Sequence, residues 1–382
     1  MSDNGSGAGA KCPPDERFMA AALSLARRAS GRVWPNPAVG ALIVDESGDL
    51  PVIRGRGWTS PPGGPHAEAV ALRNAGDAAR GATCYVTLEP CSHQGRTGAC
   101  SIALIEAGIS RVVVALADPN PRVSGRGIAM LRDAGVEVVT GVCEDEARRH
   151  HAGFVMRMRH NRPQVLLKLA ISQDGFIGRR NGGQVLITGE DVARRVHLFR
   201  AECDAICVGI GTVLSDDPEL TCRLPGMSHL SPVRVVLDAR ADLPMNSYLA
   251  RTAGEVPVWL IVSNAADYEK TDALAARGVT VIRVPQDEAG RIAPHVALRV
   301  LGQRGITRLL LEGGSRVAES FVAAGAVDEV MAYHGTATVG EGGVKPLGDH
   351  GLELLDEKGF VRLPGRRRVG GESFEYLRRE EG

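Results

Sequence analysis

Residues 83–100 have the sequence TCYVTLEPCSHQGRTGAC, an apolar strand followed by two cysteines, Cys91 and Cys100, with eight residues between them. Upstream, residues 61–68 read PPGGPHAE, so His66 and Glu68 open a predicted helix directly after a Pro/Gly turn. In an α/β domain, the loop after a strand and the start of the neighbouring helix meet at one edge of the sheet. We therefore expect His66, Cys91 and Cys100 to converge there.

One imidazole and two thiolates suit zinc and leave its fourth position open, as in catalytic rather than structural zinc sites. Glu68 is two residues from His66, and we expect it to carry a proton rather than to bind the metal. The sequence thus predicts one zinc ion per chain and hydrolysis of an exocyclic amine from a pyrimidine-like ring. The alternative is that His66 and the two cysteines only fill the core, and their order around Glu68 argues against it.

The overall composition is that of an ordinary globular enzyme. Lys plus Arg equals Asp plus Glu at 45 each, and aromatic residues make up 4% of the chain, which argues against nucleic-acid binding. No apolar run reaches the roughly 18 residues of a membrane span. The first residues have neither the basic nor the apolar region of a secretory signal, so we expect a cytoplasmic protein that does not bind membranes.

Strand and helix patterns alternate along the chain and predict two α/β domains. We expect a disordered leader over residues 1–14, a zinc-dependent domain over 15–150, a linker over 151–162 and a second domain over 163–382. The linker ends at the Asn161-Arg162-Pro163 breaker.

The second half contains RLLLEGGSRVAESF at residues 308–321, a strand that runs through Gly313-Gly314 into a helix. Such a helix start presents free N–H groups to a phosphate. A tight turn without any ligand explains the two glycines equally well. A complete dinucleotide fingerprint of the Gly-x-Gly-x-x-Gly type is missing from this half.

Several motifs together resemble the bifunctional deaminase/reductase family of riboflavin biosynthesis, RibD. In the first half they are PNPAVG (35–40), HAE (66–68), TLEPCSH (87–93), GRT (95–97), DPNP (118–121) and GRG (125–127). The long interval between the two cysteines departs from the general deaminase pattern and fits this family. In the second half they are KLAISQDG (168–175) and TVLSDDPELTCR (212–223).

The resemblance implies a cytidine-deaminase-like three-layer αβα domain followed by a dihydrofolate-reductase-like α/β domain. The first would deaminate a phosphorylated diaminopyrimidine with zinc, and the second would reduce the ribosyl side chain to ribityl with NADPH. The partner is then a small phosphorylated pyrimidine. We also expect a homo-oligomer, whose subunit number the sequence does not give.

The resemblance also implies roles for individual residues. Asp216 would carry a proton in the reduction. Contacts with NADPH are expected from Ala170, Leu186, Thr212, Asp216, Gly314, Ser315, Arg316, Val317, Ala318, Glu319 and Ser320. Contacts with substrate are expected from Asn36, His93, Gln184, Arg200, Leu220, Arg223 and Glu312, with the 95–97 loop as a further candidate.

Two departures from the family pattern concern the second half. Residue 186 is Leu where some relatives have Trp, and residues 334–348, HGTATVGEGGVKPLG, lack a Pro-Lys step found in relatives. Two alternatives therefore stay open for this half beside the reductase: a nucleic-acid-binding module, and a degenerate reductase fold without activity.

Overall fold

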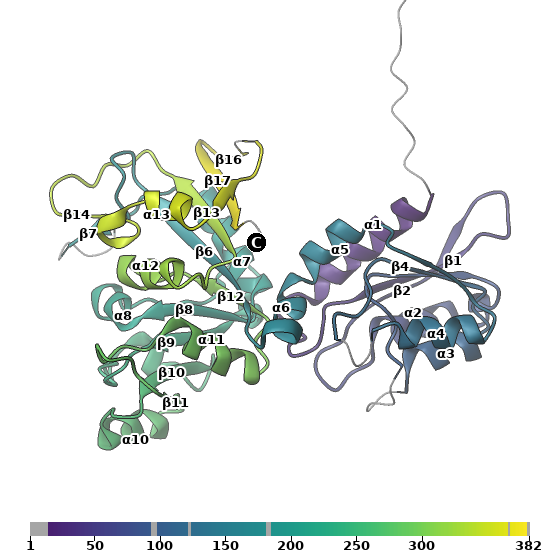
Figure 1. Ribbon diagram of the computed structural model, residues 1–382, viewed down its shortest axis with the longest axis horizontal. Coiled ribbons are helices and arrows are strands. Elements are labelled where there is room, and N and C mark those ends of the chain that lie inside the picture. The colour runs from purple at the N-terminus through teal and green to yellow at the C-terminus, as the bar shows by residue number, and fades with distance from the viewer. Residues whose placement is uncertain (1–13, 93–97, 121–123, 181–184, 366, 380–382) are drawn as a thin grey trace, which may run out of the picture. The chain divides into compact units, whose positions relative to one another are not determined.

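The computed structural model describes residues 14–92, 98–120, 124–180, 185–365 and 367–379 (Figure 1). The chain forms two compact units. The first comprises the residues up to Ala29 together with Asn36–Val155, and the second comprises Ser30–Pro35 together with the residues from Met156 onward. Most of the expected linker is helical, because α6 spans Ala152–His160. Of the expected leader, Pro14 is the first residue of α1, and residues 1–13 lie outside the described part.

The first unit is a sheet with strand order β2-β1-β3-β4-β5. Its strands are β1 (Gly40–Asp45), β2 (Val52–Trp58), β3 (Thr83–Val86), β4 (Arg111–Val114) and β5 (Glu137–Thr140), and its helices are α1 (Pro14–Ala26), α2 (Ala67–Ala75), α3 (Cys100–Glu106), α4 (Arg126–Asp133) and α5 (Glu144–His150), with short turns η1 (Arg27–Ala29) and η2 (Gly76–Ala79). Strands β3, β4 and β5 are parallel, and β1 is antiparallel to both β2 and β3. In Figure 1, α1 and α5 cover one face of the sheet, and α2, α3 and α4 cover the other.

Strand β2 was not predicted, because its sequence VIRGRGW has neither a clean alternation nor an apolar run. Its two glycines have a packing reason. A Cβ atom at Gly55 would lie 2.1 Å from the Ala71 carbonyl oxygen, and one at Gly57 would lie 2.1 Å from that of Ala67. The missing side chains therefore let α2 lie directly against β2, and this contact fixes the helix whose start carries His66 and Glu68.

The second unit has a sheet with strand order β11-β10-β9-β8-β12-β6-β13-β17-β15, with β16 paired to β17. Its strands are β6 (Gln164–Ile171), β8 (Ala205–Gly209), β9 (Val233–Leu237), β10 (Val258–Ser263), β11 (Thr280–Val284), β12 (Arg308–Leu311), β13 (Glu329–His334), β15 (Phe360–Arg362), β16 (Arg367–Val369) and β17 (Glu372–Arg379), and a separate pair joins β7 (Gly178–Arg179) to β14 (Gly343–Val344). The strands from β11 to β13 in this order are parallel to their neighbours, whereas β17 is antiparallel.

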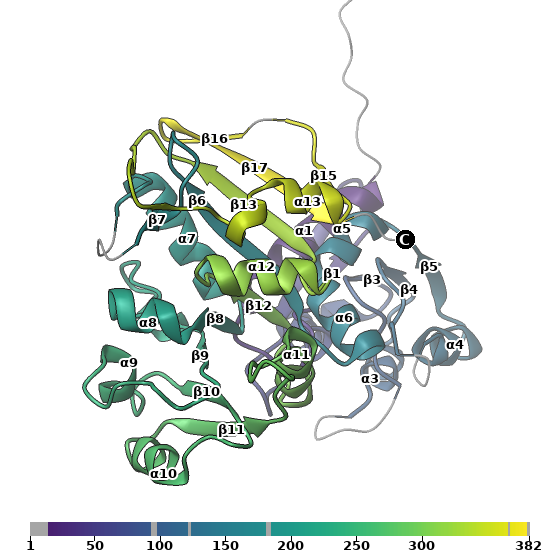
Figure 2. The same ribbon diagram turned by 60° about the vertical axis from the view of Figure 1, so that its left-hand side comes forward.

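Helices cover both faces of this sheet, as the two buried clusters show. The helices are α7 (Glu190–Glu202), α8 (Ile210–Asp216), α9 (Tyr248–Arg251), α10 (Tyr268–Ala276), α11 (Pro294–Gln303), α12 (Ser315–Ala323) and α13 (Glu353–Glu357), with turns η3 (Ser228–Leu230) and η4 (Gly348–His350). Side chains of α11, α12 and α13 pack with Val165, Leu167 and Leu169 of β6 on one face. Side chains of α7, α8, α9 and α10 belong to the cluster of Leu166 on the other. Figure 2 shows α11 and α12 side by side over one face.

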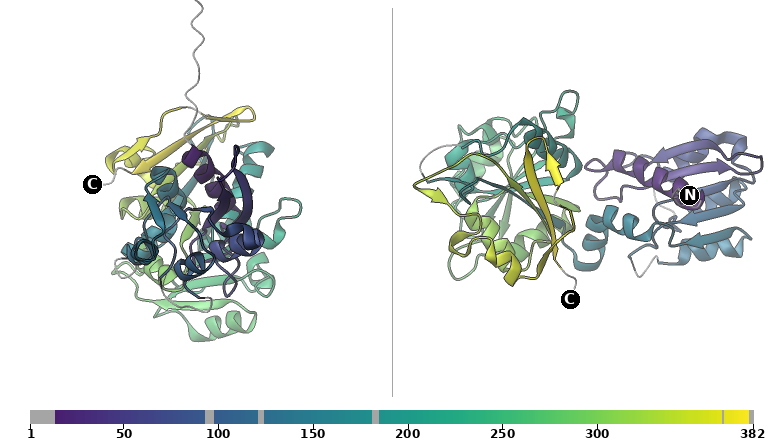
Figure 3. Two further views of the ribbon diagram at one scale, coloured as in Figure 1. Left: turned by 90° about the vertical axis from the view of Figure 1, so that its right-hand side faces the viewer. Right: turned by 90° about the horizontal axis from the view of Figure 1, so that it is seen from above.

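The C-terminal segment forms the antiparallel strands β16 and β17. These strands lie at one edge of the second sheet together with β15, drawn in yellow in Figure 3. Among the described residues, no helix combines the length and the apolar character that a membrane crossing requires.

Candidate active sites

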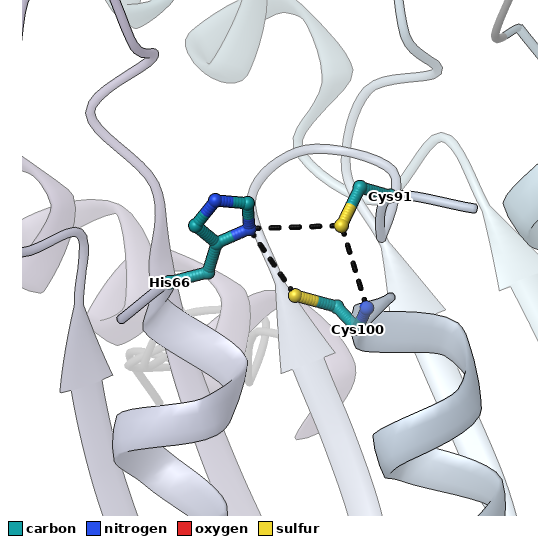
Figure 4. A group of neighbouring side chains, drawn as sticks. All are labelled: His66, Cys91 and Cys100. Carbon is teal, nitrogen blue, oxygen red and sulfur yellow. Dashed lines mark hydrogen bonds between the residues drawn. The ribbon is translucent and has the colours of Figure 1, made fainter. Parts of the chain in front are cut away.

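Three potential metal ligands meet at one end of the first sheet. His66 is the N-cap residue of α2, Cys91 lies beyond the end of β3, and Cys100 is the first residue of α3. The Nδ1 atom of His66 lies 3.6 Å from Sγ of Cys91 and 3.3 Å from Sγ of Cys100. Figure 4 shows all three side chains pointing toward a common centre, as the sequence predicted.

The geometry of this triad fits a tetrahedral zinc ion. With Zn–S near 2.3 Å and Zn–N near 2.05 Å, ideal angles give sulfur-to-nitrogen separations of about 3.6 Å. The two observed separations, 3.6 and 3.3 Å, are close to this value. All three ligand atoms lie within 4.8 Å of one another. The donor set and its spacing therefore suit one zinc ion with an open fourth position.

The thiol of Cys91 is the more acidic of the two. Hydrogen bonds from the Cys100 side chain and from His66 lower the pKa of Cys91 well below that of an ordinary thiol, although burial opposes this effect. The backbone N–H of Cys100 also donates to Cys91 Sγ at 3.3 Å. In turn, its hydrogen bond with Cys91 raises the pKa of His66. A thiolate is thus available as a metal ligand near neutral pH.

Glu68 lies one position into α2 and is 4% exposed. Burial raises its pKa to about 7, and the negative charge of Cys91 adds to this effect. A carboxyl group with a pKa near neutrality can both accept and return a proton. This is the property expected of the residue that was predicted to carry the proton.

The second unit contains a cleft of about 1950 Å³ at the carboxyl ends of β8, β9 and β12. Ligands of open α/β sheets bind in this position. The cleft is lined by most of the residues predicted to contact cofactor or substrate in this half, namely Ala170, Leu186, Thr212, Asp216, Gly314, Ser315, Arg316, Val317, Glu319, Ser320, Arg200, Arg223 and Glu312.

Arg200 and Glu312 lie in this cleft as a bidentate ion pair. Nε and one terminal nitrogen of Arg200 donate to the two oxygens of Glu312, each at 2.9 Å. Both side chains are about one-tenth exposed, at 12% and 11%. Burial would raise the pKa of Glu312, but the charge and hydrogen bonds of Arg200 outweigh it and lower the pKa. The sequence predicted both residues for the site but not their pairing, since 112 positions separate them.

Lys168 is a cleft residue for which no role was predicted. It is on β6 at a half-buried position next to Leu167 and Leu169, and burial lowers its pKa, against the attraction of Glu312. A lysine in the middle of the apolar run QVLLKLAI was the available signal. Asp216, which was predicted to carry the proton, lies on the cleft wall with an exposed side chain that accepts from the Ser215 hydroxyl.

Two predicted contacts lie elsewhere. Ala318 is fully buried in the core, because its position on α12 faces the sheet rather than the cleft. Leu220 is 4% exposed and packs in the opposite core cluster, with a left-handed φ of 55°. Their side chains therefore do not line the cleft. Asn36 is half-buried in the first unit, whereas Gln184, His93 and the 95–97 loop lie outside the described residues.

Comparison with known proteins gives two family matches. Residues 13–116 match the family described as cytidine and deoxycytidylate deaminase zinc-binding region, and residues 163–365 match the RibD C-terminal domain. The Aquifex aeolicus riboflavin biosynthesis protein RibD is 38% identical over 96% of this chain and 98% of its own length. The chain belongs to the RibD family.

Other members show the same full-length similarity. The RibD proteins of Bacillus amyloliquefaciens and Escherichia coli are 40% and 36% identical, over 85% and 92% of this chain and the same shares of their own. The Acinetobacter baumannii RibD structure (form 1) has a TM-score of 0.83 at 33% identity, covering 96% of this chain and 99% of that one. A deaminase/reductase structure from Thermotoga maritima has a TM-score of 0.82 at 34% identity, covering 96% and 98%.

Membership in the RibD family confirms the predicted fold and function. The first unit is a zinc-binding deaminase domain, the second is a reductase domain of an NADPH-dependent family, and the chain is a bifunctional enzyme of riboflavin biosynthesis. The zinc-binding match includes His66, Glu68, Cys91 and Cys100. All residues that line the cleft fall within the second match.

Proposed function

We propose that the first unit deaminates a diaminohydroxyphosphoribosylaminopyrimidine and that the second reduces the resulting 5-amino-6-(5-phosphoribosylamino)uracil. These compounds are named for the Thermotoga maritima relative. The observation that carries the proposal is the convergence of His66, Cys91 and Cys100 beside the buried Glu68. The substrate of both units is then a small phosphorylated pyrimidine.

In the deamination, His66, Cys91 and Cys100 would hold zinc, which supplies the Lewis acidity that makes water lose a proton near neutral pH. Glu68 takes one proton of the attacking water and delivers it to the ring nitrogen, and it then takes the second proton, from the hydroxyl of the adduct, and delivers it to the leaving amine. Water adds to the ring carbon, the carbon–nitrogen bond breaks, and ammonia leaves. Asn36 and His93 remain proposed contacts to the substrate.

In the reduction, the residues that line the cleft would hold NADPH, which would supply the hydride. The start of α12, where the N-cap Gly314 has no side chain, offers backbone N–H groups to a cofactor phosphate. Thr212, Leu186 and the exposed face of α12 would complete this contact. Arg223, which is half exposed and paired with Glu219 at 3.4 Å, is the arginine we assign to the substrate phosphate.

Lys168 is the residue we assign to the proton of the reduction. It lies in the cleft with Glu312 and Arg200, and its lowered pKa makes it a better proton donor than an ordinary lysine. Asp216 remains the alternative proton donor. Its carboxylate is exposed to solvent, as in an ordinary surface residue, which makes it the weaker candidate. The ion pair of Arg200 with Glu312 fixes the position of both side chains in the cleft.

The protein is proposed to act in the cytoplasm as a homo-oligomer, without binding nucleic acid or membranes. The size of the cleft supports a catalytic second unit over a degenerate one, because its volume exceeds the roughly 300–1,000 Å³ of a single small-ligand pocket and suits a cofactor together with a substrate.

The test is incubation of the full chain with the diaminopyrimidine phosphate, with and without NADPH. Without NADPH, we expect one ammonia per substrate and accumulation of the aminouracil. With NADPH, we expect one equivalent to be oxidised for each ribityl product. Deamination without any NADPH oxidation would remove the reductase proposal.

The zinc assignment is tested on the same preparation. We expect one zinc per chain by elemental analysis, and loss of both zinc and deamination in Cys91→Ala. Cys143→Ala is the matched control, because that half-buried cysteine lies outside the triad and should keep zinc and activity. Zinc and full deamination in Cys91→Ala would contradict the assignment.

A further inference from the structure

Glu89 is a buried carboxylate two residues before the ligand Cys91, and it is 4% exposed. Its Oε2 atom accepts hydrogen bonds from the backbone N–H groups of Asp118 and Gly125, each at 3.0 Å. Its Oε1 atom accepts from those of Gly127 at 3.0 Å and Ile128 at 3.4 Å. One carboxylate thus binds four N–H groups from two segments: the turn at residues 118–120 and the start of α4 at residues 124–128.

These hydrogen bonds explain how α4 begins. Its N-cap residue is Gly125, which has a left-handed φ of 78° and no side chain that could accept a hydrogen bond. The first N–H groups of a helix need an acceptor, and the helix dipole favours a negative charge there. Glu89 supplies both from a distant part of the chain, 38 residues from Gly127.

The start of α4 also lies directly against the segment that holds the metal ligands. A Cβ atom at Gly127 would lie 2.0 Å from the carbonyl oxygen of Pro90, so only glycine fits there. Pro90 precedes Cys91, whose carbonyl oxygen accepts from the N–H of Ser101 at 3.2 Å and from its hydroxyl at 2.7 Å. Helix α3, which begins with Cys100, packs on α4.

We propose that Glu89 is a positioning residue for the deamination. It fixes the start of α4 against Pro90, which precedes the ligand Cys91, and it holds the turn at 118–120 beside that helix start. These two segments would then form the wall of the pyrimidine pocket next to the triad. Glu89 acts through this wall and does not touch the reacting atoms. The inference rests on the proposed deamination and adds to it the residue that shapes the substrate pocket.

The decisive variant is Glu89→Gln, which keeps the side-chain shape but replaces one acceptor oxygen with an NH₂ group facing two N–H donors. Because the triad and Glu68 stay in place in this variant, we expect it to bind substrate more weakly. We expect KM for the pyrimidine phosphate to rise about 10- to 100-fold, with a smaller fall in kcat, because a misplacement of about 1 Å in a substrate-positioning segment can cost up to roughly 10²-fold. Zinc should stay at one per chain, and NADPH-dependent reduction of the aminouracil should be unchanged.

Asp204→Asn is the matched control. Asp204 is equally buried, at 4% exposed, and accepts from the N–H groups of Thr307 and Arg308 in the second unit. This variant should leave the deamination KM at its wild-type value. Hydrogen exchange gives an independent readout, because the amides of Gly127 and Ile128 should exchange faster in Glu89→Gln while those of β3 and β4 do not change.

A second variant keeps the inference testable where Glu89→Gln does not fold. Gly127→Ala pushes the start of α4 away from Pro90 and should raise KM in the same way. An unchanged KM in either folded variant would overturn the proposal, as would loss of zinc in parallel with activity, because Glu89 would then support the ligands instead of the wall. Failure of the wild-type chain to deaminate would instead refute the proposed function.

Discussion

Glu68 in the first unit and Glu312 in the second are both buried at a candidate site, and they have opposite acid–base properties. Glu68 is 4% exposed, and burial raises its pKa to about 7. Glu312 is 11% exposed, but its two hydrogen bonds to Arg200 lower its pKa. The charge of a nearby partner, and not the depth of burial, therefore decides whether such a carboxyl group exchanges protons or stays ionised.

The difference separates two uses of the same side chain. Glu68, which has no guanidinium partner among the described residues, can take up and release a proton near neutral pH, as hydrolysis of an amine requires. A glutamate paired with arginine instead fixes the position of both groups. We therefore expect the loss of Glu68 to affect chemistry and the loss of Glu312 to affect the structure of the cleft.

The largest effect is expected from Glu68→Gln. The amide cannot shuttle a proton, and general acid–base catalysis contributes about 10²- to 10⁴-fold to a rate, so kcat for deamination should fall by that factor. Zinc binding should persist, since Glu68 is not one of the three ligands. Ammonia release measures the effect, and NADPH oxidation with the aminouracil serves as an internal control on the same chain. A kcat within threefold of wild type would show that another group carries the proton.

The sequence was informative where function depends on neighbours along the chain. His66, Glu68, Cys91 and Cys100 lie at the ends of secondary-structure elements, where strand and helix patterns predict which side chains meet. The pairing of Arg200 with Glu312 depends on the juxtaposition of α7 and β12, which no local pattern encodes. The same holds for Glu89, because its partners are backbone N–H groups that every residue type except proline carries.

The structure differs from the sequence predictions at two other places, Ala318 and strand β2, and both differences have local causes. Ala318 was expected in the cofactor site because a whole turn of helix was assigned to it, but a helix exposes only some of its positions to any one neighbour. Strand β2 was missed because Gly55 and Gly57 weaken the strand pattern, although the same glycines allow α2 to pack. In both cases packing between elements decided the outcome.

The second effect in size is expected from Glu312→Gln. This change leaves the Arg200 guanidinium buried without its ionic partner, which typically costs about 3–5 kcal/mol. Denaturant unfolding of the full chain should show this loss in the transition of the second unit only. Arg200→Met combined with Glu312→Gln should recover much of the stability, because no charge then stays unpaired. Equal stability of wild type and Glu312→Gln would mean that the pair is not formed in solution.

The same pair predicts a pH dependence. The pKa of Glu312 is lower in the folded chain than its ordinary value of about 4.3, so its contribution to stability is fully present above that value. The contribution is lost as the pH falls through the lowered pKa. The stability difference between wild type and Glu312→Gln should therefore be constant from pH 7 to about pH 5 and shrink at lower pH.

The smallest effect is expected at the rim of the cleft, where neither burial nor charge acts strongly. Leu186 is 80% exposed and lines the cleft. An indole ring there would offer a flat surface for stacking on a cofactor ring, worth about 0.5–1.5 kcal/mol. Leu186→Trp should thus lower the Kd for NADPH about 2- to 10-fold, as measured by quenching of the new tryptophan.

Leu214→Trp is the control: Leu214 is also exposed, at 59%, but lies on α8 outside the cleft lining, so the Kd of this variant should stay at the wild-type value. Equal Kd values for the two variants would place the cofactor away from residue 186, and the leucine would then have no bearing on reductase activity.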